Sequence, residues 1–170
     1  MKLRPDFEKP VGAVLDVLAK RPELDASRVG IWGRSFGGYA APRAASCDDR
    51  LKACISIGGF YDMASIWDRL PTGVKDTLQF GFGVESHAAA RERAKDFTLA
   101  GRLGKMRHPL LIVHSGLDTV CPVEESERIK REAGGPTTLV VFPDGNHVCD
   151  NMPYKVRPLM ADWMARELGV

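Results

Sequence analysis

The chain has 170 residues, of which 44% are hydrophobic and 27% are charged, a composition typical of one soluble globular domain with its own core. Lys and Arg number 24 against 22 Asp and Glu, and this net charge of +2 argues against binding to nucleic acid or a membrane surface through bulk charge. The sequence shows neither a signal peptide nor an apolar stretch that could span a bilayer, which predicts a cytoplasmic protein.

The predicted elements alternate between helices and strands from the beginning of the chain. Apolar residues at helical spacing predict a first helix, which the Asp6 side chain caps and which ends before Pro22. Residues 28–32 form a short strand, a helix of small residues follows over 36–46, and residues 51–57 have the apolar run of a buried strand.

The segment from about residue 60 to residue 107 interrupts this alternation. It is rich in aromatic residues, ends in a predicted helix over 88–103, and is too long for a simple connection between two strands. We therefore interpret it as an inserted helical cap. Its basic tail is typical of a solvated helix face, and attraction of an anionic substrate is the alternative.

Strands and helices alternate again after this segment. Strands over 110–113 and 138–142 flank a helix over 126–132, and a last helix runs from about 156 to 168. Strands separated by helices predict an α/β fold with a mostly parallel sheet of about four strands and helices on both faces. We expect residues 1–170 to form a single domain of this kind.

A nucleophile motif lies between the first predicted strand and the helix that follows it. Gly33-Arg34-Ser35-Phe36-Gly37 matches G-x-S-x-G, whose tight turn lifts a serine hydroxyl clear of a sheet. Ser35 is then the nucleophile, and the Phe36 N–H at the start of the helix favours a developing oxyanion. The alternative is a glycine-rich turn capped by serine. Arg34 is a candidate for binding a substrate carboxylate, although this position more often packs or forms a local ion pair.

A serine nucleophile needs a base, and the base needs a carboxylate that orients it. Asp118 follows the strand over 110–113 and His147 follows the strand over 138–142, so the chain order is nucleophile, acid, histidine. Both residues lie at carboxyl ends of strands, where such sheets place their sites. We therefore predict a catalytic triad of Ser35, Asp118 and His147.

Other residues compete less well for these roles. Asp144 shares the short loop of His147 and would have to reach around a tight turn, so we prefer Asp118 as the acid. His114 lies at the end of a strand and fits a buried, hydrogen-bonded histidine better than a base. The four cysteines are widely separated and form no metal-binding motif, and nothing in the sequence supports a metal or an organic cofactor.

At these residues the sequence resembles a known family. The matching segments are residues 33–39 (Gly-Arg-Ser-Phe-Gly-Gly-Tyr), residues 54–62 (Cys-Ile-Ser-Ile-Gly-Gly-Phe-Tyr-Asp), Asp118 and residues 145–149 (Gly-Asn-His-Val-Cys). They are similar to an α/β-hydrolase group of esterase-like enzymes that includes 2,6-dihydropseudooxynicotine hydrolase. The likeness extends over most of the chain, from about residue 25 to residue 168.

This resemblance implies a serine hydrolase that acts through an acyl-enzyme on a small molecule, at an ester or at a carbon–carbon bond beside a ketone. Ser35 would attack the carbonyl, His147 would protonate the departing group, and water would release the acyl group. Members of the group can carry a further acidic residue after the second strand. The nearest candidate here is Asp68, and the lack of a glutamate argues against carbon–carbon cleavage and leaves ester hydrolysis open.

The aromatic residues of the inserted segment are candidates for contacts with the substrate. Phe60, Tyr61 and Trp67 are expected to form an aromatic pocket, with Asp68 as a polar member or, alternatively, as a helix-surface or capping residue.

The family's early strands, and the loop that supplies its second oxyanion N–H, have no counterpart before Arg28. We therefore expect a preceding portion of the protein, or another copy of the chain in a homo-oligomer, to complete the sheet. Two alternative functions remain open at this point. One is a catalytically incomplete fragment or binding module, and the other is a peptidase of the prolyl oligopeptidase kind, whose relatives share the G-x-S-x-G-G-Tyr string.

Overall fold

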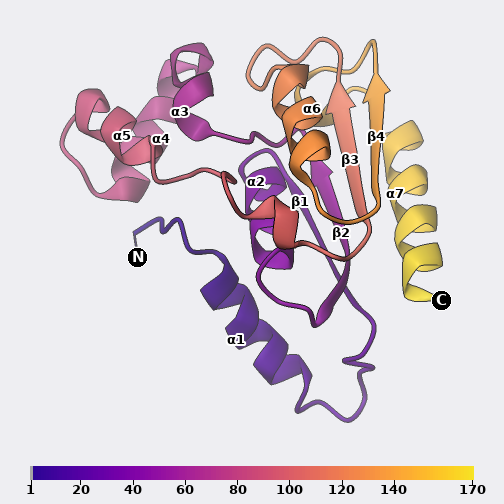
Figure 1. Ribbon diagram of the computed structural model, residues 1–170. Coiled ribbons are helices and arrows are strands. Elements are labelled where there is room, and N and C mark those ends of the chain that lie inside the picture. Colours follow the sequence, from indigo (N-terminus) through magenta and orange to yellow (C-terminus); the bar gives the residue numbers. More distant parts are fainter. Residues whose placement is uncertain (1) are drawn as a thin grey trace.

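The computed structural model describes residues 2–170 and contains a four-stranded parallel sheet with helices on both faces (Figure 1). The strands lie in the order β1-β2-β3-β4, so each strand pairs with the next one in the chain. They are β1 (Val29–Arg34), β2 (Leu51–Ile57), β3 (Leu110–Ser115) and β4 (Thr137–Phe142). The predicted fold class, a partial and mostly parallel α/β-hydrolase sheet, agrees with this topology.

The helices that connect and cover the strands fall into two groups. Those outside the segment between β2 and β3 are α1 (Glu8–Leu18), α2 (Phe36–Ala45), α6 (Val123–Glu132), the 3-10 turn η3 (His147–Cys149) and α7 (Pro153–Leu168). Those between β2 and β3 are α3 (Met63–Ile66), η1 (Trp67–Arg69), α4 (Thr72–Phe82), α5 (His87–Ala94) and η2 (Leu103–Lys105).

The central strands are buried on both faces, because successive side chains of a strand point to opposite sides of the sheet. The side chains that face α7 are Ala53, Ile55, Ile57, Leu111 and Val113. Those that face α1, α2 and α6 include Cys54, Leu110 and Ile112. Burial on both faces produces the continuous apolar runs by which the sequence predicted these strands.

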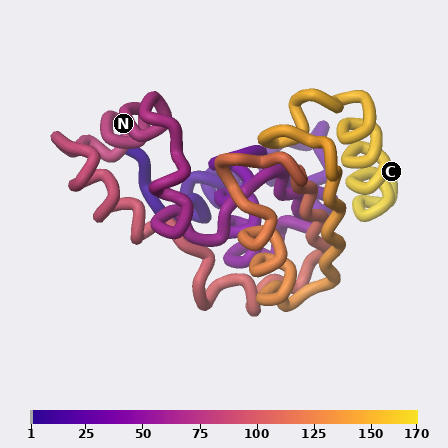
Figure 2. Tube along the Cα trace, turned by 90° about the horizontal axis from the view of Figure 1, so that it is seen from above, coloured from indigo at the N-terminus to yellow at the C-terminus, as the bar shows by residue number. Residues whose placement is uncertain are grey.

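The segment between β2 and β3 forms a lobe beside the sheet (Figures 1 and 2). The prediction of one helix over residues 88–103 is wrong, because α5 ends at Ala94. Phe97 and Leu99 are fully buried, and their backbone groups bond to residues 61–63 in place of a further helical turn. These long-range hydrogen bonds and buried side chains outweigh the local helical preference.

The N-terminal residues pack against α2 and α4. The prediction that the Asp6 side chain caps α1 is wrong, since this carboxylate pairs with Arg4 and Lys9 instead. Within α1, Glu8 accepts a hydrogen bond of 2.7 Å from the buried Arg43 guanidinium of α2. This ion pair joins the two helices, and a buried arginine is tolerated because it is paired.

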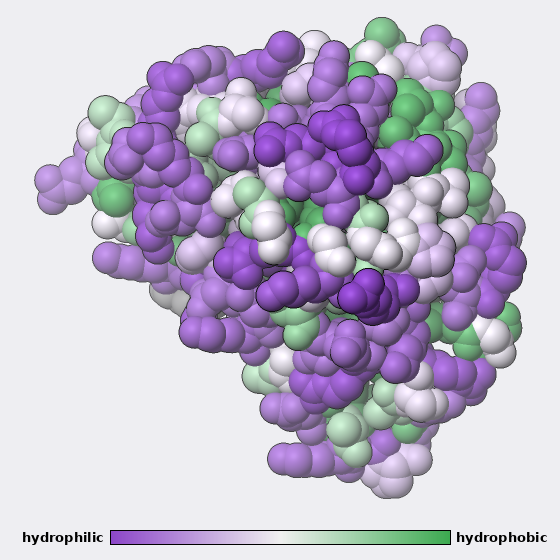
Figure 3. Space-filling view, viewed as in Figure 1, coloured by the Kyte–Doolittle hydropathy of each residue, from purple (hydrophilic) through white to green (hydrophobic). Residues whose placement is uncertain are grey.

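The molecular surface shows two features that concern partners. Figure 3 shows one face, on which hydrophilic side chains predominate. No helix within residues 2–170 combines the length and the apolarity needed to cross a membrane. On the sheet itself, β1 is an edge strand and its Trp32 side chain is 58% exposed, beside Met160 and Met164 of α7.

Candidate active site

The turn between β1 and α2 holds Ser35 in a strained conformation. Its φ of 53° lies in the left-handed region that residues with a Cβ atom rarely adopt, and its N–H donates to the Ile57 carbonyl at a distance of 2.8 Å. At Gly33 a Cβ atom would lie 2.1 Å from the Gly37 carbonyl oxygen, so only glycine fits there. The motif glycine thus permits the turn that presents the Ser35 hydroxyl at the carboxyl edge of the sheet.

A second close approach fixes α2 against the loop after β2. A Cβ atom at Gly38 would lie 2.7 Å from the Gly59 Cα atom, whereas one at Gly37 would meet nothing within 4 Å. Glycine at 38 therefore allows the first turn of α2 to approach the chain that leaves β2. Phe36, as the first residue of this helix, has an N–H without an intrahelical acceptor, available to an oxyanion.

Three side chains from three loops form a continuous hydrogen-bonded chain at this edge. The Ser35 Oγ atom lies 2.9 Å from His147 Nε2, and His147 Nδ1 lies 2.8 Å from Asp118 Oδ2. The other Asp118 oxygen accepts the N–H groups of Val120 and Cys121, each at 2.9 Å. The structure thus brings together the three residues that the sequence predicted as a triad.

The environment of Asp118 keeps its carboxylate charged. Burial acts to raise its pKa, but hydrogen bonds from His147, Cys121 and Val120 outweigh this effect and leave the pKa below its usual value. A charged Asp118 holds a proton on His147 Nδ1, so the Nε2 atom is free to accept the Ser35 hydroxyl proton. The arrangement is suited to general-base activation of the serine.

The loop that carries His147 is anchored by the side chains of Ser115 and Asn151, which the sequence analysis did not single out. The Cys149 N–H donates to the Ser115 hydroxyl at 3.0 Å, and the Asn146 N–H donates to the Asn151 side-chain oxygen at 3.0 Å. Val148 within this turn has a φ of 57°. These contacts tie the histidine loop to the end of β3 and fix the direction of the imidazole.

An apolar cavity of about 280 Å³ lies next to the triad. It is lined by Ser35, Phe36 and His147, by Phe60 from the end of β2, by Met63 and Ile66 of α3, by Leu70, Val74, Thr77 and Leu78 around α4, by Val120 and Cys121, and by Leu3. The cavity therefore lies between the carboxyl edge of the sheet and the lobe that follows β2.

Comparison with known proteins assigns this site to a family. The family model described as the prolyl oligopeptidase family matches residues 9–170. The chain belongs to this family. Among curated relatives, 2,6-dihydropseudooxynicotine hydrolase of Paenarthrobacter nicotinovorans is 32% identical over 173 residues, covering 94% of this chain and 43% of that protein. Hydrolyase poxO of Penicillium oxalicum is 48% identical over 84 residues, covering 46% of this chain and 19% of that protein.

Solved structures agree with the family assignment. The crystal structure of 2,6-dihydroxy-pseudo-oxynicotine hydrolase matches with a TM-score of 0.93 and 32% identity, covering 98% of this chain and 48% of that chain. AbyA5, with a TM-score of 0.88 and 21% identity, shares the fold and covers 99% of this chain and 51% of that chain. The predicted resemblance is confirmed: the chain has part of the α/β-hydrolase fold and spans less than half the length of the curated hydrolases it matches.

Two of the predicted substrate residues, Phe60 and Arg34, differ in whether they line the cavity beside Ser35. Phe60 lines the cavity, with its ring 5.9 Å from the Phe36 ring in an edge-to-face arrangement. Arg34 is exposed and forms an ion pair of 2.7 Å with Asp150, outside the cavity. The position of Arg34 thus fits the local ion pair that the sequence left open, because its guanidinium is already occupied by a carboxylate.

The other three candidates point away from the cavity. The Tyr61 hydroxyl donates to Glu132, and the Trp67 side chain is buried, with 3% of it exposed, in the core of the lobe. Asp68 pairs at 2.6 Å with Arg91, and both side chains are exposed. None of the three lines the cavity, so the aromatic composition of this segment mainly reflects its core.

The competing acid and base are not part of the chain of hydrogen bonds at Ser35. His114 is fully buried, accepts the Ser126 hydroxyl at Nδ1 and donates from Nε2 to the Cys121 carbonyl, as expected for a structural histidine. Burial lowers its pKa. Asp144 is exposed on the histidine loop, and the carboxylate that contacts His147 is Asp118.

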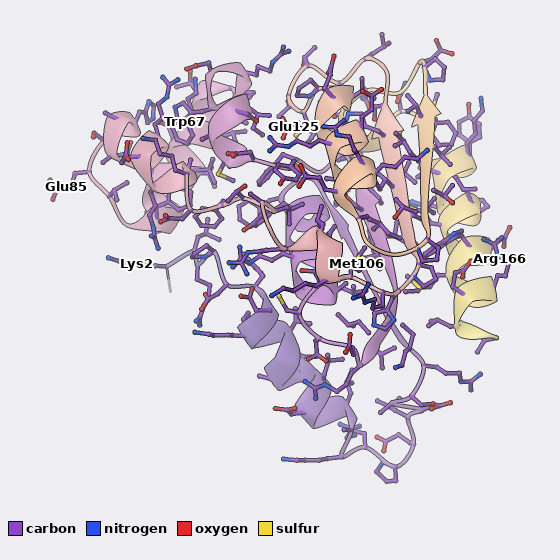
Figure 4. The ribbon with its side chains drawn as sticks, viewed as in Figure 1. Lys2, Trp67, Glu85, Met106, Glu125 and Arg166 are labelled. Atoms are coloured by element: carbon purple, nitrogen blue, oxygen red, sulfur yellow. The ribbon has the colours of Figure 1, made fainter. Side chains whose placement is uncertain are left out.

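Glu125 of α6 was not predicted, and it holds the segment that leads from Phe60 into α3. Its carboxylate is 9% exposed and accepts the Tyr61 and Asp62 N–H groups at 2.8 and 3.0 Å and the Ser65 hydroxyl at 2.9 Å (Figure 4). Figure 4 shows Glu125 on α6, on the side that faces the lobe. This carboxylate sets the position of the cavity wall relative to the sheet.

Proposed function

We propose that the chain is the catalytic part of a serine hydrolase that cleaves small-molecule esters through an acyl-enzyme. The observation that carries the proposal is the hydrogen-bonded chain from Asp118 through His147 to Ser35, at distances of 2.8 and 2.9 Å, on a strained strand-to-helix turn. Named hydrolases among the relatives support the same reaction class.

The geometry gives each group a role in two acyl-transfer steps. His147 Nε2 takes the Ser35 proton as Oγ attacks the ester carbonyl, and the Phe36 N–H stabilises the resulting oxyanion. The intermediate collapses when His147 protonates the leaving alcohol oxygen. Water then attacks the acyl carbonyl while His147 takes its proton, and His147 passes that proton to Ser35 Oγ as the carboxylic acid leaves. Asp118 stabilises the imidazolium in both steps.

Ester hydrolysis is favoured over carbon–carbon cleavage by the composition of the cavity. Departure of a carbon leaving group requires protonation of a carbanion-like atom, for which the family resemblance suggested an additional acidic residue. Among residues 2–170, the residues that line the cavity include no Asp or Glu, and Asp68 lies outside it in an exposed ion pair. His147, with Nε2 2.9 Å from Ser35 Oγ, would then protonate the leaving group, which is sufficient for an alcohol or a phenol.

A fluorophosphonate probe followed by intact-mass measurement tests the proposal. We expect one probe molecule on the unmodified chain, one on Ser27→Ala, which changes an exposed serine far from the elbow, and none on Ser35→Ala. A folded chain that is not labelled would favour a catalytically incomplete module and overturn the proposal. Aryl esters and a prolyl anilide are then compared as substrates, and cleavage of the anilide alone would indicate a peptidase.

A further inference from the structure

Within residues 2–170, the lining of the cavity beside Ser35 contains no Asp, Glu, Lys or Arg side chain. Apart from Ser35 and His147, the polar lining groups within the described residues are the Thr77 hydroxyl and the Cys121 thiol. The Thr77 hydroxyl already donates to the Gly73 carbonyl at 2.8 Å. Burial raises the pKa of Cys121, so this thiol stays neutral. An ion placed here would lose its hydration without gaining a partner.

The cavity is walled largely by core side chains and opens at α4, where Val74 and Thr77 are exposed. Phe60, Met63, Ile66, Leu70 and Leu78 are each less than a tenth exposed, so most of its wall belongs to the core between the sheet and the lobe. A largely buried apolar space suits the part of the substrate that remains bound between the two steps of the reaction. That part is the acyl group, which stays on the nucleophile after the alcohol has left.

We propose that this cavity is an acyl-binding pocket for neutral aliphatic acyl groups of medium length, an inference that rests on the proposed ester hydrolysis. Its volume of about 280 Å³ is at the lower end of the range for ligand pockets. At about 30 Å³ for each water-sized group, it holds an acyl chain of up to roughly eight carbon atoms. Longer acyl chains would extend out of its open side at α4 without further burial, and anionic acyl groups would find no partner in it.

Leu3 limits the length of the acyl chain at the side of α4. This residue lines the cavity, and its N–H donates to the Gly81 carbonyl at 2.6 Å, which holds the N-terminal segment against the lobe. Because Leu3 lies outside the regular elements, Leu3→Ala enlarges the pocket without removing a side chain of the sheet core. Val14→Ala is a matched control, since Val14 is 56% exposed on α1 and does not line the cavity.

A series of p-nitrophenyl esters with acyl chains from two to ten carbons tests the proposal. We expect kcat/KM to rise about fourfold for each added methylene group up to about eight carbons and then to fall. Leu3→Ala shifts the optimum towards longer chains, and Val14→Ala leaves it unchanged. The monoanionic p-nitrophenyl ester of succinate is cleaved at least fiftyfold more slowly than the butyrate ester.

The outcomes separate this inference from the proposed function. Efficient labelling of Ser35 together with a flat chain-length series, or with equal cleavage of the anionic ester, overturns the acyl pocket and leaves the hydrolase intact. A rate that depends on the length of the alcohol and not of the acyl chain also overturns it. Binding to Ser35→Ala gives a measurement independent of turnover: 2-octanone should raise its unfolding temperature more than 2-butanone does. Equal shifts contradict the proposal.

Discussion

Replacement of Asp118 by Asn tests the proposed mechanism at its most specific contact. In the present structure one carboxylate oxygen accepts the N–H groups of Val120 and Cys121, and the other accepts His147 Nδ1. An Asn that keeps its oxygen on the two backbone donors must direct its NH₂ group towards His147. The flipped amide would give up both backbone hydrogen bonds, at a cost of about 1 kcal/mol each.

The unflipped orientation of the side-chain amide is therefore lower in free energy, and it places the NH₂ group opposite His147 Nδ1. A donor facing Nδ1 forces the histidine proton onto Nε2, which then cannot accept the proton of Ser35. Loss of the correct tautomer in a serine triad lowers kcat about 10⁴-fold, equivalent to about 5 kcal/mol of transition-state stabilisation. We expect Asp118→Asn to reduce p-nitrophenyl butyrate hydrolysis and the rate of fluorophosphonate labelling by this factor.

Asp144→Asn is the matched control, because Asp144 is exposed on the histidine loop. Its rates should stay within about threefold of the unmodified chain, and near-ultraviolet circular dichroism should show that both variants are folded. Asp118→Asn with more than a tenth of the original labelling rate would refute the assignment of Asp118 as the acid of the triad. A large loss in Asp144→Asn would transfer that role to Asp144.

Three further predictions concern stability. Gly38→Ala should lower the free energy of unfolding, measured in urea, by about 1–3 kcal/mol, because its Cβ atom would lie 2.7 Å from the Gly59 Cα atom. Gly37→Ala should change this free energy little, because a Cβ atom there meets nothing within 4 Å. Equal effects of the two substitutions would contradict the close approach at Gly38. Glu125→Ala should cost about 2 kcal/mol in the same assay and raise KM for esters more than it lowers kcat, since the buried Tyr61 N–H and the partly buried Asp62 N–H beside the cavity wall lose their acceptor. An unchanged KM would count against this role. Because the folded-state pKa of Asp118 is lowered, its contribution to stability is present above about pH 4 and is lost as the pH falls through that lowered pKa. Acid titration of unfolding should therefore give a smaller loss of stability below pH 4 for Asp118→Asn than for the unmodified chain, and parallel curves would refute the shift.

The strands and the predicted triad could be identified from the sequence because their signals are local. The inner strands are apolar along their whole length, since both faces are covered, and Ser35, Asp118 and His147 each directly follow a strand or lie in the loop after it. Parallel strands bring their carboxyl ends to one edge, so strand-end positions in the sequence become neighbours in space. The proximity of these three side chains could therefore be predicted from the order of the elements.

The lobe and its contacts depend on packing between distant segments, which a single sequence does not contain. The expected helix over 88–103 ended early because residues 97–99 bond to residues 61–63. Aromatic composition suggested a pocket that includes Trp67, but this side chain points into the core of the lobe, and aliphatic residues such as Ile66 line the cavity. Composition predicts how apolar a segment is, whereas the direction of each side chain is decided by its neighbours.

Several contacts that position Ser35, Asp118 and His147 link neighbouring strands, or the loops that follow them, at one edge of the sheet. The Ser35 N–H bonds to the carbonyl of Ile57 at the end of β2, the neighbouring Gly58 N–H bonds to Val113 of β3, and Cys149 bonds to Ser115. These links run from the elbow to β2, from β2 to β3 and from the histidine loop to β3, and none of them involves the outer edge of β1. That edge, where Trp32 is exposed, influences the elbow only through the stability of β1 itself. We therefore expect the rate of Ser35 labelling to fall at moderate urea concentrations that fray β1, below the concentrations that unfold the inner strands.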